Sequence, residues 1–286
     1  MRNLTEANLT DAVLGKLEGV TDARFKQIMT SLIKHLHAFV REVELTEEEW
    51  FTGIQFLTAT GQKCDDKRQE YILLSDTLGV SMLVDAINHR KPSGATESTV
   101  LGPFYVAGAP ERPLGANIAE GVEGELTYFS GRVRAPGGQA IAGATLDLWS
   151  TDGQGWYDVQ LKGNEGMRAR GKIKTDAEGR YRFWTIKPVS YPIPTDGPVG
   201  KMLLKMGRHP YRPAHTHMIV SAPGYETLTT HVFVEGDPYL ESDAVFGVKN
   251  SLVASFVRHE SGMAPDGKRM DRPYYTVAYD FGLKPV

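Results

Sequence analysis

The pattern of hydrophobic positions predicts helices in the first third of the chain. Residues 25–43 repeat apolar side chains every three or four positions, the period of a helix with one apolar face. Thr46 and Glu49 match a capping box that opens a second helix, which Gly61 ends. A third helix is predicted from Lys67 to about Asn88. We expect its inward positions to be Tyr71, Leu74, Leu78, Met82 and Leu83.

After a linker at 90–95 the apolar period changes to that of strands. Residues 126–134 and 144–149 alternate, and residues 175–183 are predicted to form a hairpin that turns at 176–179. Further strands are expected at 215–221, 227–234 and 275–280. Many short strands separated by glycine and proline are typical of an antiparallel sandwich. We therefore predict an α+β chain, in which a helical region at 1–95 precedes an antiparallel β-sandwich catalytic domain at 96–286. The wide apolar face of the helices predicts a homodimer.

Composition narrows the class of protein. Of the 286 residues, 41% are hydrophobic and 23% charged, as in a globular protein without a membrane span. The net charge of −3, with no lysine or arginine cluster, argues against nucleic-acid binding. The first residues lack the apolar core of a signal peptide, which predicts a cytoplasmic protein. The single cysteine, Cys64, excludes an intrachain disulfide and cysteine-based metal sites.

The strongest chemical signal is a pair of histidines in a strand pattern. His215 and His217 are two residues apart, so both side chains project from one face of the strand. Two imidazoles on one face can supply half of a metal site. Arg212 stands beside them, and a fixed cation there favours an anionic substrate or a carbanion-like transition state. His231 falls in the next strand. The alternative is that these histidines only pack.

A metal at this pair needs further ligands, and the candidates are aspartate, glutamate or tyrosine oxygens. Two tyrosines are distinguished by their context. Tyr157 lies in a glycine-rich loop after a strand, and Tyr191 lies in a proline-stiffened segment. Either would serve equally as a packed aromatic side chain, so the residues alone give a list of candidates.

Three motifs connect these residues to a known family. They are the Gly-x-Tyr-Asp loop at 155–158, Tyr-Pro-Ile-Pro at 191–194 and Arg-Pro-Ala-His-Thr-His at 212–217. In this order, and over nearly the whole chain, the sequence resembles the intradiol ring-cleaving catechol dioxygenases. The runs 207–213 and 237–247 bring it nearest to members that act on hydroxyquinol. The resemblance implies an enzyme that cleaves 1,2,4-trihydroxybenzene between its 1,2-hydroxyls with O2. The product would be a ring-opened dicarboxylate, 3-hydroxy-cis,cis-muconate or maleylacetate.

The resemblance also implies a non-haem Fe(III) site. Its protein ligands would be Tyr157, Tyr191, His215 and His217, and anionic phenolates suit Fe(III). Tyr191 would be the tyrosine that leaves the metal and takes up a substrate proton, and Arg212 would stabilise developing negative charge. His231 stands where catechol enzymes tend to have glutamine, and it is expected beside the site without being a ligand.

The substrate pocket is likewise carried over from the family. The implied pocket positions are Leu73, Asp76, Val100, Leu101, Gly102, Pro103, Phe104, Ile193, Pro194, Arg212 and Val245. Asp76 is the acceptor expected for the third hydroxyl of hydroxyquinol, although a helix-surface or capping aspartate is the other interpretation. A lipid bound between subunits at the helices is a further property that the resemblance implies.

Three alternatives compete with this interpretation. A catechol or chlorocatechol 1,2-dioxygenase would have the same iron site and a different substrate profile. A zinc hydrolase would use the two histidines with other partners and be colourless. A non-enzymatic β-sandwich binding module would hold no stoichiometric metal.

Overall fold

The computed structural model describes residues 2–66, 68–161, 163 and 166–286. Contacts divide the chain into two compact units, one ending at Ala59 and the other beginning at Thr60. The boundary between the units is set by contacts in the folded chain. The change predicted near residue 95 instead marks where helical segments give way to strands. Among the described residues, no helix has both the length and the apolar character needed to cross a membrane.

The first unit is helical. It contains α1 (Leu9–Gly15) and α2 (Ala23–Glu42), and α3 (Glu47–Gln62) runs across the division. The capping box is confirmed, because Glu49 Oε2 accepts the Thr46 backbone N–H at 3.0 Å and Thr46 Oγ1 accepts that of Glu49 at 3.3 Å. The helix predicted over 25–43 is confirmed as α2, and α1 was not predicted. Apolar side chains of α2 such as Phe25 and Leu36 are about half exposed in the chain.

The third predicted helix is wrong in length and in face. Two helices replace it, α4 (Glu70–Thr77) and α5 (Val80–Asn88), and Lys67 lies outside the described residues. The chain breaks at Gly79, whose φ of +74° belongs to the left-handed region that glycine tolerates. Of the predicted inward positions, Tyr71, Leu78 and Leu83 are exposed, whereas Leu74 and Met82 are half-buried. The buried face of α4 consists of Glu70, Leu73, Asp76 and Thr77.

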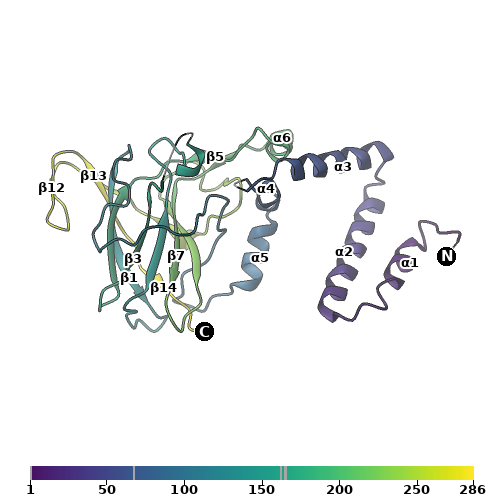
Figure 1. The fold of residues 1–286 in the computed structure, drawn as a ribbon, viewed down its shortest axis with the longest axis horizontal. Helices are drawn as coiled ribbons and strands as arrows, with labels where there is room; N and C mark the ends of the chain where they lie inside the picture. The colour runs from purple at the N-terminus through teal and green to yellow at the C-terminus, as the bar shows by residue number, and fades with distance from the viewer. Residues whose placement is uncertain (1, 67, 162, 164–165) are drawn as a thin grey trace. The chain divides into compact units, whose positions relative to one another are not determined.

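The second unit contains two packed sheets (Figure 1). In the first sheet, β1 (Leu126–Arg134) pairs with β4 (Arg180–Ile186) on one side, and on the other with β13 (Tyr274–Ala278) and then β14 (Phe281–Gly282). β10 (Val257–His259) pairs with β13. The second sheet has the order β3 (Arg170–Lys174), β2 (Thr145–Trp149), β7 (His215–Ser221), β8 (Leu228–Val234) and β9 (Val253–Ala254).

Short elements complete the unit. They are α6 (Pro198–Lys205), the 3₁₀ turns η1 (Asp158–Gln160) and η2 (Asn250–Leu252), and two two-stranded ladders. One ladder pairs β5 (Tyr191–Pro192) with β6 (Tyr211–Arg212), and the other pairs β11 (Gly262–Met263) with β12 (Arg269–Met270). The sandwich is confirmed, but its description as antiparallel is incomplete, because β1–β13, β1–β14 and β8–β9 pair in parallel.

The predicted hairpin at 175–183 is also corrected. The turn forms, since Asp176 N–H donates to the Arg180 carbonyl at 3.0 Å. The strands on either side then separate, because β3 pairs with β2 and β4 pairs with β1. The turn therefore joins the two sheets, which local sequence does not distinguish from a hairpin.

The main core lies between the sheets. Alternate positions of β1 and β4, including Phe129 and Phe183, meet alternate positions of β2 and β7, including Leu146 and Met218. Phe129 and Phe183 stack with ring centroids 5.2 Å apart. The opposite positions of β2 and β7 face away from this core, toward the region described next.

Candidate active site

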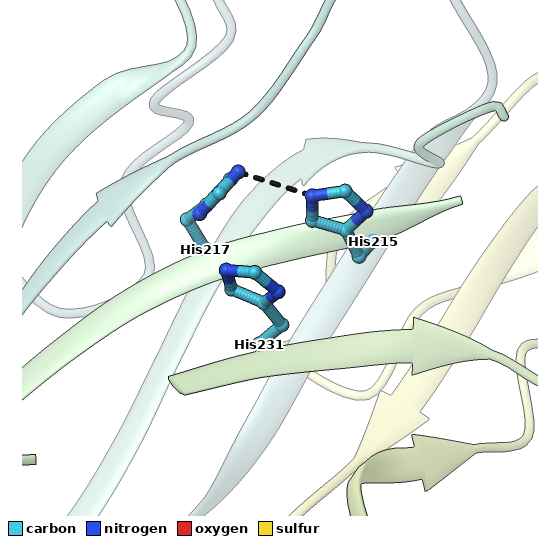
Figure 2. A group of neighbouring side chains, drawn as sticks. All are labelled: His215, His217 and His231. Atoms are coloured by element: carbon cyan, nitrogen blue, oxygen red, sulfur yellow. Dashed lines mark hydrogen bonds between the residues drawn. The ribbon is translucent and has the colours of Figure 1, made fainter. Parts of the chain in front are cut away.

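The three clustered histidines come from two neighbouring strands. Along β7, Met218 and Val220 enter the inter-sheet core, so the alternation puts His215 and His217 on the outer face of the sheet. His217 pairs in register with His231 of β8, which places His231 on that same face. Figure 2 shows the three rings gathered there. The His217–His231 ring centroids are 4.1 Å apart and the His215–His231 centroids 4.6 Å apart.

The two tyrosines reach the histidines from different loops. Tyr157 precedes η1, and its backbone N–H is fixed by the Gln160 side chain at 2.9 Å. Tyr191 lies in β5, directly opposite Arg212 in β6. The β5–β6 ladder therefore connects the Tyr-Pro-Ile-Pro motif to the Arg-Pro-Ala-His-Thr-His motif.

The donor atoms of Tyr157, Tyr191, His215 and His217 converge on one point. Tyr157 Oη lies 2.8 Å from His217 Nε2 and 3.0 Å from Tyr191 Oη. His215 Nε2 lies 3.0 Å from His217 Nε2 and 3.5 Å from Tyr191 Oη. All four side chains are buried. Two phenol oxygens and two imidazole nitrogens at these distances fit a metal ion that prefers nitrogen and anionic oxygen.

A second grouping contains only histidines. Nitrogens of His215, His217 and His231 lie within 4.8 Å of one another. Only the set that contains the tyrosines supplies oxygen donors, and its members are linked by contacts of 2.8–3.5 Å. We therefore assign the tyrosine-containing set as the candidate metal site. His231 lies beside it on β8, where it is hydrogen-bonded to the Val100 backbone.

Both candidate histidine ligands are neutral, because burial lowers the pKa of each. Burial and the nearby charge of Arg212 lower the pKa of His215 to about 3. Its Nδ1 donates to the Pro213 carbonyl at 2.6 Å, which leaves the Nε2 lone pair for the site. Burial also lowers the pKa of His217, whose Nδ1 has no hydrogen-bond partner among the described groups. The His217 ring is instead held by stacking on Trp149, with centroids 4.6 Å apart and planes 14° apart.

The tyrosines are neutral phenols in this environment. Burial raises the pKa of Tyr157 well above its ordinary value, and the neighbouring Tyr191 adds to the shift. Burial raises the pKa of Tyr191 as well, although Arg212 opposes the shift. Ionisation of the two phenols therefore requires positive charge beyond what the described side chains supply.

Arg212 is a buried cation at the edge of this group. Its Nη1 lies 3.2 Å from His215 Nε2, and its Nε lies 3.1 Å from Asp243 Oδ1. Burial tends to lower the pKa of Arg212, but attraction to Asp243 and Tyr191 leaves that pKa above its ordinary value. Asp243 was not predicted as a site residue. The sequence signal for Asp243 is its place in the 237–247 run, which carries part of the resemblance to the hydroxyquinol enzymes.

The implied substrate-pocket residues lie in several segments of this unit. Leu73, Val100, Ile193 and Val245 are buried, whereas Leu101 is partly exposed. A pocket of about 190 Å³ is lined by Leu73, Pro103, Phe104 and Pro194, together with Arg68 and Glu70, which were not predicted. Phe104 stacks on Tyr157 with centroids 4.5 Å apart, so this wall touches the candidate metal site. Gly102 also lies against the candidate metal site, because a Cβ there would lie 3.2 Å from His217 Cε1.

Asp76 lies on the buried face of α4, with 3% of its surface exposed, so the helix-surface interpretation is wrong. Burial raises its pKa, while a hydrogen bond from Ser81 and the charge of Arg212 oppose the rise. The electrostatic effect of Arg212 places Asp76 in the neighbourhood of the site.

Comparison with known proteins gives the family. Residues 100–285 match the Dioxygenase family model, and residues 22–96 match the model of the catechol dioxygenase N terminus. The chain belongs to the intradiol ring-cleaving dioxygenases. It is therefore an enzyme, and the interpretations as a zinc hydrolase or a non-enzymatic binding module no longer stand.

Individual relatives cover the chain almost completely. A 6-chlorohydroxyquinol 1,2-dioxygenase of Cupriavidus pinatubonensis is 53% identical over 286 residues, 100% of both chains. The crystal structure of hydroxyquinol 1,2-dioxygenase from Pseudomonas putida DLL-E4 is similar with a TM-score of 0.92 and 50% identity, and the match covers 98% of this chain and 99% of that one. The structure of catechol 1,2-dioxygenase from Pseudomonas arvilla C-1 has a TM-score of 0.85 at 30% identity, covering 98% and 91%.

Proposed function

We propose that this intradiol dioxygenase cleaves hydroxyquinol between its 1,2-hydroxyls and yields a ring-opened dicarboxylate. The convergence of Tyr157, Tyr191, His215 and His217 is the observation that carries the chemistry. The identity to the hydroxyquinol-type relatives supports the substrate, as does the buried acceptor Asp76. A catechol or chlorocatechol 1,2-dioxygenase is the competing proposal, because solved structures of both kinds of enzyme are similar to this chain.

The proposed cofactor is non-haem Fe(III), held by Tyr157, Tyr191, His215 and His217. Two neutral imidazoles and two phenols suit a hard, highly charged cation once the phenols lose their protons. When bound, ferric iron would withdraw charge from the two substrate oxygens and open the ring to attack by dioxygen.

The side chains around this position have roles of their own in the proposal. Tyr191 can hold a proton at Oη, and so can take up one of the two that the diol loses on binding. Arg212 carries a permanent positive charge toward the reacting face, where charge develops on the ring. Phe104 and Trp149 pack on Tyr157 and His217 and exclude water from the donors.

Specificity for hydroxyquinol is assigned to Asp76 together with the pocket wall. The third hydroxyl distinguishes hydroxyquinol from catechol, and a buried carboxylate that accepts its hydrogen bond favours the triol. The apolar residues Leu73 and Val245 would pack on the ring.

The test is a visible spectrum of the iron-loaded protein, followed by substrate without air. We expect a broad tyrosinate-to-iron band that shifts when hydroxyquinol is added. Air is then admitted, and kcat/KM is compared for hydroxyquinol, catechol and a chlorocatechol. A preference for catechol or chlorocatechol would overturn the substrate proposal and leave the iron site intact. A protein that stays colourless after loading with Fe(III) would overturn the ligand set.

The oligomeric state is a separate proposal. The exposed apolar face of α2 would be covered in a homodimer formed by the helical region, and the lipid implied by the family would bind there. Light scattering at micromolar concentration tests the dimer, and lipid extraction with mass spectrometry tests the lipid. We further propose a cytoplasmic location, which fractionation of expressing cells would test.

A further inference from the structure

The Asp243 carboxylate is buried and accepts hydrogen bonds from two groups, the Arg212 guanidinium and the backbone of residues 245–247. On one side it faces the Arg212 guanidinium as a fork, with Nε to Oδ1 at 3.1 Å and Nη2 to Oδ2 at 3.3 Å. On the other side its oxygens accept the backbone N–H groups of Val245 at 3.2 Å and Gly247 at 2.9 Å. These four donors hold the carboxylate as an ion, because its pKa, which burial would raise, stays below its ordinary value through Arg212 and Gly247.

The fork determines where the remaining nitrogen of Arg212 points. A guanidinium is planar, so fixing Nε and Nη2 on Asp243 also fixes Nη1. That nitrogen lies 3.2 Å from His215 Nε2, at the edge of the proposed ligand set. The backbone of Arg212 is set by its ladder partner Tyr191. The side chain is long and flexible, and its direction is fixed by the Asp243 fork together with a hydrogen bond to the Tyr191 side chain.

The segment that carries Asp243 is itself held firmly. Thr99 Oγ1 donates to the Gly247 carbonyl at 2.8 Å, and Arg208 Nη2 donates to the Ala244 carbonyl at 2.8 Å. A Cβ at Gly247 would stand 3.0 Å from Arg212 Nη2, so the turn closes directly on the guanidinium. The turn also contains Val245, one of the proposed pocket residues. One carboxylate therefore connects a wall of the substrate pocket to the catalytic cation.

We propose that Asp243 is a positioning residue of the ring-cleavage reaction, which aims Arg212 Nη1 at the reacting face and fixes the Val245–Gly247 turn beside it. The proposal rests on the proposed function, in which Arg212 stabilises charge that develops on the substrate. This role differs from that of a purely structural ion-pair partner. A structural partner would affect stability, whereas a positioning residue also affects turnover through Arg212.

The first test is Asp243→Glu, which keeps the charge and moves it by one methylene. In the iron-loaded enzyme we expect kcat to fall roughly 30- to 100-fold, the effect of misplacing a catalytic group by about 1 Å. The dissociation constant for substrate without air should change less than about threefold, and the visible band should remain, because the four proposed ligands are untouched. Unchanged kcat would overturn the proposal.

The second test is a double-mutant cycle of Asp243→Asn with Arg212→Gln. If Asp243 acts through Arg212, Asp243→Asn lowers kcat by less than about threefold once the guanidinium is gone. The melting temperature of the metal-free protein gives an independent readout. It should fall by several degrees in Asp243→Asn alone, which leaves Arg212 buried without its partner, and by much less in the double variant. If Asp243→Asn lowers kcat by the same factor in the Arg212→Gln background as in the parent enzyme, the proposal is overturned.

Asp85→Asn is the matched control. Asp85 is also a buried aspartate, bonded to Ser98 Oγ at 3.1 Å and Lys249 Nζ at 3.3 Å, but none of these partners belongs to the proposed site. We expect a lower melting temperature with kcat within about threefold of the parent. The parent enzyme is assayed first. If the parent cleaves neither hydroxyquinol nor catechol, the proposed function fails. If the parent is active and Asp243→Glu is equally active, only the positioning role is refuted.

Discussion

Tyr191 and Arg212 face each other across the two-residue ladder of β5 and β6. The pairing joins two separate segments and places a phenol and a guanidinium against the same atom, His215 Nε2. The backbone pairing of β5 with β6 therefore positions both the proposed proton acceptor and the proposed cation.

Iron uptake should release about two protons per site near neutral pH, because a phenolate ligand must lose its proton and both tyrosine pKa values are raised. The histidines contribute none, since their lowered pKa values already make them neutral. The apparent affinity for iron should consequently rise with pH, by roughly 100-fold per unit. Titration of metal-free protein with a ferric chelate in weak buffer measures the release. Tyr157→Phe should release one proton fewer, and an unchanged count would exclude Tyr157 as a ligand.

His231→Gln should keep one iron per chain and the visible band, because His231 is not one of the four proposed ligands. His217→Gln, which changes a proposed ligand in the same register pair, should lose most of the bound iron. Metal analysis and the visible spectrum distinguish the two variants. Loss of iron in His231→Gln alone would favour the histidine-only grouping.

Asp76→Ala should lower kcat/KM for hydroxyquinol more than for catechol, by roughly tenfold or more. The reason is that only the triol offers a hydroxyl to the buried carboxylate. The measurement is the ratio of kcat/KM values on the two substrates. An equal loss on both would assign Asp76 a structural role beside Ser81 and Arg212.

Gly79→Ala should destabilise the fold by about 1–2 kcal/mol, since the left-handed conformation at φ +74° costs that much for a residue with a Cβ. Thermal unfolding should show a midpoint lower by several degrees. Gly53→Ala is the control, because that glycine lies inside α3 with nothing within 4 Å of an added Cβ and is expected to become more stable. A neutral Gly79→Ala would mean that α4 and α5 can join without the break.

Local patterns were sufficient for some features and not for others. Strand alternation placed His215 and His217 on one face, because that geometry needs only neighbouring residues. Spacing could not select Tyr157 and Tyr191 from other tyrosines, since their approach depends on the β5–β6 ladder, and the family motifs supplied them. The Arg212–Asp243 contact joins residues 31 positions apart and was not predicted. The helix break did leave a local signal, the glycine at 79, which the apolar period obscured.

Strand β7 supplies Met218 and Val220 to the inter-sheet core from one face, and His215 and His217 to the proposed metal site from the other. A slip of one residue in its pairing would exchange the two sets, burying imidazoles between the sheets and turning methionine and valine toward the tyrosines. Such a chain would lose its packing and its donors together. A misassembled population should then appear as unfolded, colourless material rather than as folded enzyme with impaired turnover, so recovery of colour on refolding would report correct assembly of the whole sandwich.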